Sequence, residues 1–149
     1  MRAVIQRVTD ADVSVENDIK GKIGRGFVVL LGVEEGDNEA DAEYIAEKVS
    51  GLRVFDDSNG KMNLSITDIG GEILSISQFT LLADARKGRR PSFIRAAQPE
   101  EANRLYQFFN DMVRERGVKV EEGVFRAEML VRINNDGPVT ILLDSNKLF

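Results

Sequence analysis

The run Phe27-Val28-Val29-Leu30-Leu31-Gly32-Val33 (FVVLLGV) contains no polar side chain. An apolar run of this length, broken by Glu35-Gly36-Asp37-Asn38, is typical of a strand that is buried on both faces. Upstream, valines recur along residues 2–15, and Glu16-Asn17-Asp18 is typical of a turn. Residues 19–24 are expected to pair back as the second arm of a hairpin. The sequence therefore predicts a hairpin followed by a buried strand.

Two helices are predicted downstream of this strand. Asn38 can cap a helix over about 39–50, with acidic residues near the positive end of its dipole and Gly51 at its end. A second helix begins near Pro99 and runs to about residue 116, with Gln98 as a poor cap. Each helix carries apolar side chains that we expect in the core: Ala42, Ile45, Ala46 and Val49 in the first, and Ala102, Leu105, Phe109 and Met112 in the second.

Further strands are predicted over 71–76, 118–121, 128–133 and 139–143. The resulting order is strands, helix, strands, helix, strands, and neither a repeat nor a linker interrupts it. We therefore predict a single α+β domain over residues 1–149, with a mainly antiparallel sheet and two main helices.

The composition restricts the chemistry, because the 149 residues include no histidine and no cysteine. This excludes Ser–His and Cys–His nucleophilic pairs, disulfides and the common zinc sites. The loop at 56–61 lacks the flanking acids of an EF-hand, since positions 55 and 66 are Phe and Ile. Gly24-Arg25-Gly26 precedes a strand-like run and lacks the third glycine of a dinucleotide loop. The composition leaves open a metal that is held by carboxylates, but we expect no metal and no cofactor.

The charge is distributed unevenly along the chain. Residues 84–95 carry five basic residues against one acid, a local charge of +4, which leaves −9 on the rest of a chain whose net charge is −5. A focused basic loop on an acidic body suits one anionic ligand better than duplex DNA, so no DNA partner is expected. The alternative is a solvated loop without a ligand. No apolar run approaches the ~20 residues that cross a bilayer, and the first residues lack a signal-peptide core. A cytoplasmic location without a membrane partner is therefore predicted.

The stretch Ser77-Gln78-Phe79-Thr80-Leu81 (SQFTL) follows the strand predicted at 71–76. If the strand continued, Gln78 and Thr80 would point from a face that is otherwise apolar, and Ser77 and Phe79 would support the strand from the other face. The polar pair would then line a pocket floor. The alternative is that Thr80 is a β-branched strand former and that Gln78 lies at a sheet edge.

Five strings of sequence occur together and in order: AVIQRV (3–8), GKMNLSI (60–66), SQFTL (77–81), KGRRPSF (87–93) and NNDGPVT (134–140). Because it contains all five strings, the chain resembles the D-aminoacyl-tRNA deacylase family, formerly called D-tyrosyl-tRNA deacylases. The resemblance extends over nearly its whole length. The resemblance implies a barrel-like, homodimeric enzyme. Such an enzyme hydrolyses the ester that joins a D-amino acid, or misplaced glycine, to the 3′ end of tRNA.

Ester hydrolysis needs a nucleophile, a route for protons and donors for the developing oxyanion. Thr80 is the obvious protein nucleophile, but no histidine can serve as its base, and no motif places a lysine or carboxylate beside it. The vicinal hydroxyl of the terminal ribose can orient or activate a water instead. The resemblance implies this substrate-assisted route, with Ser77, Gln78, Phe79 and Thr80 forming the catalytic segment and backbone N–H groups around Gln78 and Phe79 as donors.

The Gly137-Pro138 pair allows two interpretations. The residues alone favour a hairpin turn at Asp136-Gly137 and a trans bond, with Pro138 at the start of the next strand. The resemblance implies a cis Gly-Pro motif that enters the active site of the partner subunit, where rigid main chain excludes an L side chain but admits D-aminoacyl and glycyl esters.

The resemblance assigns roles to further residues. Arg7 would brace the Gly-Pro motif, or else be a surface arginine. Phe125 and Met129 would line the pocket for the ribose–adenine end, or else be core residues. The single-stranded tRNA end would contact Lys87, Arg89, Arg90 and Phe93. Two other functions stay open: a non-catalytic protein that binds the tRNA end or single-stranded RNA, and a small-ligand-binding dimer without a role on RNA.

Overall fold

The computed structural model describes residues 1–149. Its strands are β1 (Arg2–Val15), β2 (Asp18–Ile23), β3 (Gly26–Gly32), β4 (Phe55–Asp56), β5 (Met62–Leu64), β6 (Glu72–Ser77), β7 (Lys119–Glu122) and β8 (Leu130–Asp144). Its helices are α1 (Glu39–Gly51), α2 (Pro99–Glu115) and the short 3-10 helix η1 (Phe79–Leu82). The predicted hairpin is confirmed, because β1 and β2 pair antiparallel around a turn at Glu16 and Asn17.

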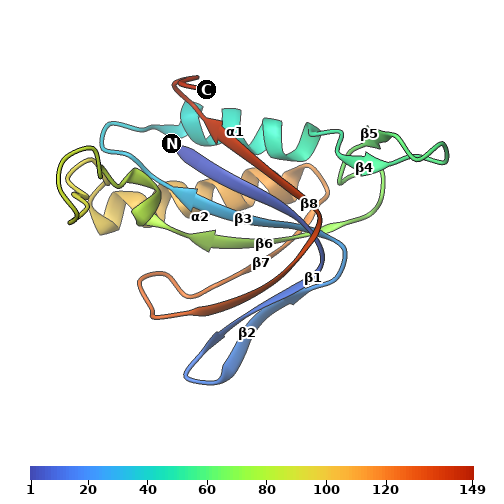
Figure 1. The fold of residues 1–149 in the computed structure, drawn as a ribbon, viewed down its shortest axis with the longest axis horizontal. Coiled ribbons are helices and arrows are strands. Elements are labelled where there is room, and N and C mark those ends of the chain that lie inside the picture. The colour runs from blue at the N-terminus through green and yellow to red at the C-terminus, as the bar shows by residue number, and fades with distance from the viewer.

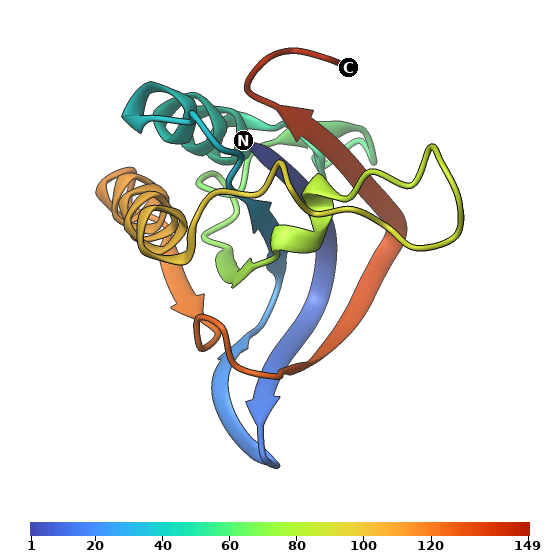
Figure 2. The same cartoon turned by 90° about the vertical axis from the view of Figure 1, so that its left-hand side faces the viewer.

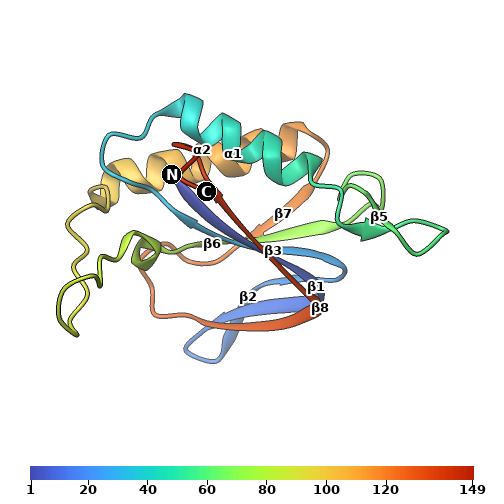
Figure 3. The ribbon, with the colours of Figure 1, turned by 45° about the horizontal axis from the view of Figure 1, so that its top comes forward.

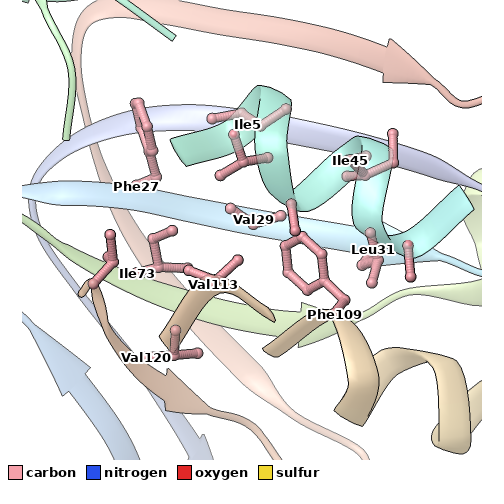
Figure 4. Close-up of a cluster of buried hydrophobic side chains, with 14 of the residues drawn as sticks. Ile5, Phe27, Val29, Leu31, Ile45, Ile73, Phe109, Val113 and Val120 are labelled. Carbon is pink, nitrogen blue, oxygen red and sulfur yellow. The ribbon is translucent and has the colours of Figure 1, made fainter. Parts of the chain in front are cut away.

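Strand β3 is the buried strand that the FVVLLGV run predicts. It pairs antiparallel with β1 on one side and parallel with β6 on the other, and all its side chains except Leu30 are buried. Figure 4 shows Phe27, Val29 and Leu31 of this strand in one cluster with Ile45 of α1 and Phe109 of α2. Both helices lie over the same face of the sheet (Figures 1 and 3), so their apolar stripes close one main core.

The sheet is mixed, with the order β2-β1-β3-β6-β7 and with β8 along the free side of β1. The antiparallel pairs that β1 makes with β2, β3 and β8 confirm the mainly antiparallel prediction. The parallel pairs β3–β6 and β6–β7 were not predicted. Each arises because α1 or α2 carries the chain back across the sheet, as a parallel connection requires.

The long strands β1 and β8 curve around the far face of the sheet (Figure 2), which gives the nearly closed, barrel-like shape. Seven buried apolar residues fill the interior of this curve: Val8, Ala11, Val13, Ile23, Val28, Leu74 and Ile76. The fold is therefore one α+β domain with two main helices, as predicted, and it has cores on both faces of the sheet.

The caps of the helices agree with the sequence. The Asn38 side chain accepts the Ala40 N–H at 2.9 Å, and Asp41 accepts the Asn38 N–H at 2.9 Å, which completes a capping box. Pro99 begins α2, where its missing N–H costs no hydrogen bond, and Gln98 provides no side-chain cap. None of the helices has the length and apolar character needed to cross a membrane.

The prediction of two separate strands at 128–133 and 139–143, joined by a hairpin turn, is wrong. Residues 130–144 form the single strand β8, which stays paired with β1 before and after Gly137. Gln6 faces Thr140 and Val8 faces Asn135, so residues 136–139 lie opposite the single residue Arg7. The sequence Asp136-Gly137-Pro138-Val139 is thus a wide bulge rather than a chain reversal. We refer to these four residues as the Gly-Pro bulge.

Candidate active site

A cavity of about 490 Å³ opens at the end of β6. Its walls come from residues 76–79, from the start of α2 with the residues before it, and from residues 125–131 between β7 and β8. Most of the lining is apolar, and the polar side chains are those of Ser77, Gln78 and Arg126. A mostly apolar cavity of several hundred Å³ with a few polar groups is typical of a small-ligand site.

The SQFTL stretch does not continue strand β6, and the predicted alternation of faces is wrong beyond Ser77. The chain turns into η1, because β3 carries a glycine where this turn packs. A Cβ atom at Gly32 would lie 2.5 Å from Leu82 Cδ2 and 2.9 Å from the Gln78 carbonyl oxygen. Phe79 is 55% exposed and lines the cavity together with Ser77 and Gln78, so neither Ser77 nor Phe79 supports the strand from behind.

Gln78 and Thr80 come together in this turn, where Gln78 Nε2 donates to Thr80 Oγ1. Thr80 is exposed, is not part of the cavity lining, and has no hydrogen bond to a lysine or carboxylate. The Gln78 N–H is already donated to the Leu31 carbonyl at 2.8 Å. The Phe79 and Thr80 N–H groups come first in η1, where no carbonyl of the turn can accept them. Any backbone oxyanion donors in this segment are therefore at 79 and 80.

Phe125 and Met129 line the cavity opposite residues 77–79. Phe125 also packs against the main core, so the predicted pocket role and the alternative core role both describe it. Arg126 lies between them and was not predicted, although it stands in the string FRAEM (125–129) that contains both. Its backbone has a φ of 66°, its side chain is exposed, and it makes no ion pair.

The basic loop lies on the segment that joins η1 to α2 and projects from the body of the domain (Figure 2), and none of residues 84–95 lines the cavity. Two of its cations are neutralised, since Arg86 pairs with Asp84 at 2.6 Å and Arg95 pairs with Glu34. The Arg86 guanidinium holds the pKa of the Asp84 carboxyl well below its usual range. Three cations have no acidic partner within 4.0 Å: Lys87, Arg89 and Arg90. The free positive charge of the loop is therefore concentrated on the three residues predicted to contact an anionic ligand.

Phe93 attaches this loop to the SQFTL stretch. Its ring meets the Phe79 ring edge to face, with the centroids 5.2 Å apart. Two isolated bridges, Asp84 with Ser92 and Glu34 with Ala96, close the base of the loop. An aromatic pair thus connects the basic loop to Phe79, which lines the cavity.

The Gly-Pro bulge lies elsewhere on the chain and does not line the cavity. The peptide bond between Gly137 and Pro138 is cis, and both residues are exposed. Gly137 has a φ of 115°, and a Cβ atom there would lie 3.1 Å from Arg7 Nη2. Of the predicted site residues, the cavity lining contains Ser77, Gln78, Phe79, Phe125 and Met129, and Phe93 packs on Phe79. The others lie outside the lining: Arg7, Thr80, Lys87, Arg89, Arg90, Gly137 and Pro138.

Arg7 is buried, so the alternative of a surface arginine is wrong. Its Nη1 donates to the Val54 carbonyl at 2.7 Å, and its Nε lies 3.2 Å from Asp136 Oδ2 as an ion pair. Asn135, which was not predicted, holds the bulge from the other side. Its amide nitrogen donates to the Arg7 carbonyl at 2.9 Å and to the Val139 carbonyl at 3.1 Å. Asn135 and Asp136 of the NNDGPVT string thus both hold the bulge against β1.

Residues 4–144 match the sequence model of the family described as D-Tyr-tRNA(Tyr) deacylase. The chain belongs to this deacylase family. Two relatives named D-aminoacyl-tRNA deacylase, from Koribacter versatilis and Thermotoga petrophila, are each 58% identical to it over 149 residues, which is 100% of both chains. The family predicted from the five sequence strings is therefore confirmed, and with it the class of enzyme, a hydrolase.

Two solved structures resemble this deacylase. One is named c-Myc DNA Unwinding Element Binding Protein, and it has a TM-score of 0.91 and 43% sequence identity over 97% of this chain and 98% of its own. The other is named as a probable eukaryotic D-amino acid tRNA deacylase, with a TM-score of 0.80 and 18% identity over 95% of this chain and 97% of its own. At 18% identity, the second likeness shows the fold alone.

Proposed function

We propose that this deacylase hydrolyses the ester of D-aminoacyl-tRNA, and of glycine mischarged on tRNA, in chirality proofreading. The observation that carries the proposal is the mostly apolar cavity at residues 77–79, where Phe93 of the basic loop packs on Phe79. Its apolar walls at Phe125 and Met129 suit the terminal adenosine and the acyl group. Lys87, Arg89, Arg90 and Phe93 are positioned for the phosphates and bases of a single-stranded 3′ end.

In the proposed reaction, water attacks the ester carbonyl carbon and the bond to the ribose oxygen breaks. The amino acid leaves as its carboxylate, and the ribose oxygen takes a proton. The neighbouring ribose hydroxyl orients or activates the water, because Thr80 has no base of its own. The Phe79 and Thr80 N–H groups would stabilise the oxyanion, since fixed backbone donors need no reorganisation when charge develops.

In a homodimer, the Gly-Pro bulge of the second copy would select the D configuration of the aminoacyl group. Support comes from its exposure, from its distance from its own cavity, and from the contacts that fix it to Arg7 and Asn135. Main chain held beside the α-carbon would exclude an L side chain, whereas a D side chain is directed elsewhere. This selection by exclusion would not depend on which D side chain is present. The cytoplasmic location and the absence of a DNA partner stay predictions.

The function is tested by incubating the protein with D-tyrosyl-tRNA and with L-tyrosyl-tRNA, in the presence of a chelator. We expect release of D-tyrosine and little release of L-tyrosine. Equal rates for the two esters, or no release from the D form, would contradict the proposal. Loss of activity on chelation would contradict the metal-free mechanism alone.

Replacing Thr80 with alanine separates the two possible nucleophiles. We expect Thr80→Ala to keep at least half of the wild-type kcat, because the attacking oxygen is that of water and the hydroxyl of Thr80 lies outside the cavity lining. Single-turnover deacylation measures this directly. Thr9→Ala, which removes another exposed threonine hydroxyl, is the control. A collapse of kcat with an acyl-enzyme trapped at residue 80 would show that Thr80 is the nucleophile.

Removing two positive charges from the basic loop should weaken tRNA binding and reduce the salt dependence of binding. Each contact to a single-stranded phosphate contributes about 0.7 to the slope of log affinity against log salt. We therefore expect the double variant Arg89→Gln/Arg90→Gln to lower that slope by about 1.4 and to raise KM roughly tenfold at low salt. The control is Lys20→Gln/Lys22→Gln, which removes two exposed charges from strand β2. An equal rise in KM in both double variants would contradict a specific role for the loop.

A second candidate function is suggested by the relative named as a DNA unwinding element binding protein. In this alternative the free cations and Phe93 bind single strands without catalysis. It predicts salt-sensitive binding of an uncharged tRNA end, or of single-stranded DNA, that is indifferent to the stereochemistry of any amino acid. A deacylation rate that depends on handedness excludes this as the sole function.

A further inference from the structure

Tyr106 joins the two strands that lead into the cavity. It lies on the inner face of α2, is 1% exposed, and donates its hydroxyl to the Ser75 carbonyl at 2.7 Å. The same carbonyl accepts the Gly123 N–H at 3.2 Å. Ser75 precedes residues 76–79 of one cavity wall, and Gly123 precedes the Phe125 wall. One carbonyl and one hydroxyl therefore connect β6, α2 and the end of β7 just behind the site.

The ring of Tyr106 makes a second connection. It stacks on the ring of Phe125, with centroids 6.2 Å apart and planes 29° apart. Ala102, one helical turn earlier on the same face of α2, lines the cavity itself. Tyr106 thus backs the Phe125 wall with its ring and holds the wall at 76–79 with its hydroxyl, although it does not line the cavity.

A residue that only filled the core would not need this hydroxyl. The other buried positions of α2 are Leu105, Phe109 and Val113, which are apolar, and Asn110, one helical turn after Tyr106. Burying a hydroxyl is unfavourable unless it finds a partner, and the Ser75 carbonyl is that partner. Burial also raises the pKa of Tyr106 to about 12, so the phenol keeps its proton and remains a donor at neutral pH.

We propose that Tyr106 is a positioning residue for the deacylation reaction, fixing the separation between the wall at 76–79 and the wall at Phe125. The inference rests on the proposed function, because it assigns the reacting ester to the space between these walls. The hydroxyl and the ring have separable effects. The hydroxyl sets where the backbone at Phe79 and Thr80 lies, which affects the chemical step. The ring sets where Phe125 lies, which affects binding.

Tyr106→Phe removes the hydroxyl and keeps the ring. We expect kcat for D-tyrosyl-tRNA to fall about fivefold, the effect of one lost hydrogen bond. KM should stay within twofold of wild type. Tyr44→Phe, which alters the only other tyrosine, is the matched control and should change neither constant. Phe125→Leu removes the stacking from the other side and should raise KM while leaving kcat within twofold.

Hydrogen exchange provides a readout that does not require activity. In Tyr106→Phe the amide of Gly123 should exchange at least tenfold faster than in wild type, while the amide of Val29 in the central strand keeps its protection. Wild-type kcat together with unchanged exchange at Gly123 would overturn the proposal. A fall in kcat matched by equal loss of protection at Gly123 and Val29 would also overturn it, since the role would then be general stability.

If the wild-type enzyme failed to hydrolyse D-tyrosyl-tRNA, the proposed function would fail, and the exchange result would still decide whether Tyr106 fixes the two walls. If Tyr106→Phe did not fold, the split between KM and kcat in Phe125→Leu would decide.

Discussion

Replacing Arg7 with alanine is expected to lower the free energy of unfolding by about 2–3 kcal/mol, because hydrogen bonds and ion pairs of a buried charged group are lost. The guanidinium donates a hydrogen bond to the Val54 carbonyl oxygen, pairs with Asp136, and lies 3.9 Å from the carboxylate of Asp56. For a domain of this size, the loss corresponds to a fall in Tm of roughly 4–12 °C. Thermal unfolding measures it directly.

The same variant tests the role of the Gly-Pro bulge. Without Arg7, residues 136–139 lose the ion pair that holds them against β1. In the proposed mechanism, hydrolysis of L-tyrosyl-tRNA should then rise about tenfold relative to that of D-tyrosyl-tRNA, an effect of about 1.4 kcal/mol on discrimination. The measurement is the ratio of the two kcat/KM values, taken well below the Tm of the variant.

Arg132→Ala is the matched control for Arg7→Ala. Arg132 pairs with Asp12 at 3.0 Å across the same β1–β8 seam, but its side chain is 60% exposed. Exposed pairs of this kind contribute about 0–1 kcal/mol, so both stability and discrimination should stay near wild type. If Arg7→Ala lost stability but kept its discrimination, Arg7 would be a core residue without a role in selecting the substrate.

Gly32→Ala is expected to lower kcat about 100-fold while the protein remains folded. The new methyl group would lie 2.5 Å from Leu82 Cδ2 and 2.9 Å from the Gln78 carbonyl oxygen, so η1 must shift. Overpacking of this kind costs about 1–3 kcal/mol. The larger effect is on catalysis, because a displacement of about 1 Å in a reacting geometry can cost 100-fold in rate. Single-turnover kinetics and thermal unfolding separate the two effects.

Gly51→Ala provides the control, since no atom lies within 4 Å of the Cβ position there. A glycine-to-alanine change without steric conflict typically stabilises a protein by about 0.4–1 kcal/mol through the unfolded state. We expect wild-type kcat in this variant. If Gly32→Ala kept a kcat within twofold of Gly51→Ala, the position of η1 would not control the reaction.

Local patterns predicted the individual elements well. The apolar run at 27–33 gave β3, the cap at Asn38 gave α1, and the turn at 16–18 gave the β1–β2 hairpin. What local patterns missed depends on contacts between distant residues. Nothing in SQFTL itself signals the 3-10 turn, because the turn packs on Gly32, more than forty positions earlier. The parallel pairs of β6 were missed because a period-two pattern reports burial and not the direction of the partner.

The candidate site, like the fold, was predicted only in part from the sequence. The family resemblance pointed to residues 77–79, 125 and 129, which line one cavity, and to Thr80, which does not. Arg126, Asn135 and Tyr106 were not selected, although Asn135 stands inside the string NNDGPVT and Arg126 stands between the predicted residues Phe125 and Met129. Tyr106 had no signal beyond a place in an apolar stripe, because only the fold places its hydroxyl against Ser75.

Strand β8 is bonded to β1 both before and after the Gly-Pro bulge. The projecting residues consequently belong to the sheet and are not the tip of a loop that could follow an incoming molecule. If the bulge selects the substrate as proposed, it would do so as a rigid surface that does not adjust to the bound acyl group. The preference for D- over L-aminoacyl esters should then be the same for large and small side chains. It should also stay constant with rising temperature until the sheet begins to unfold.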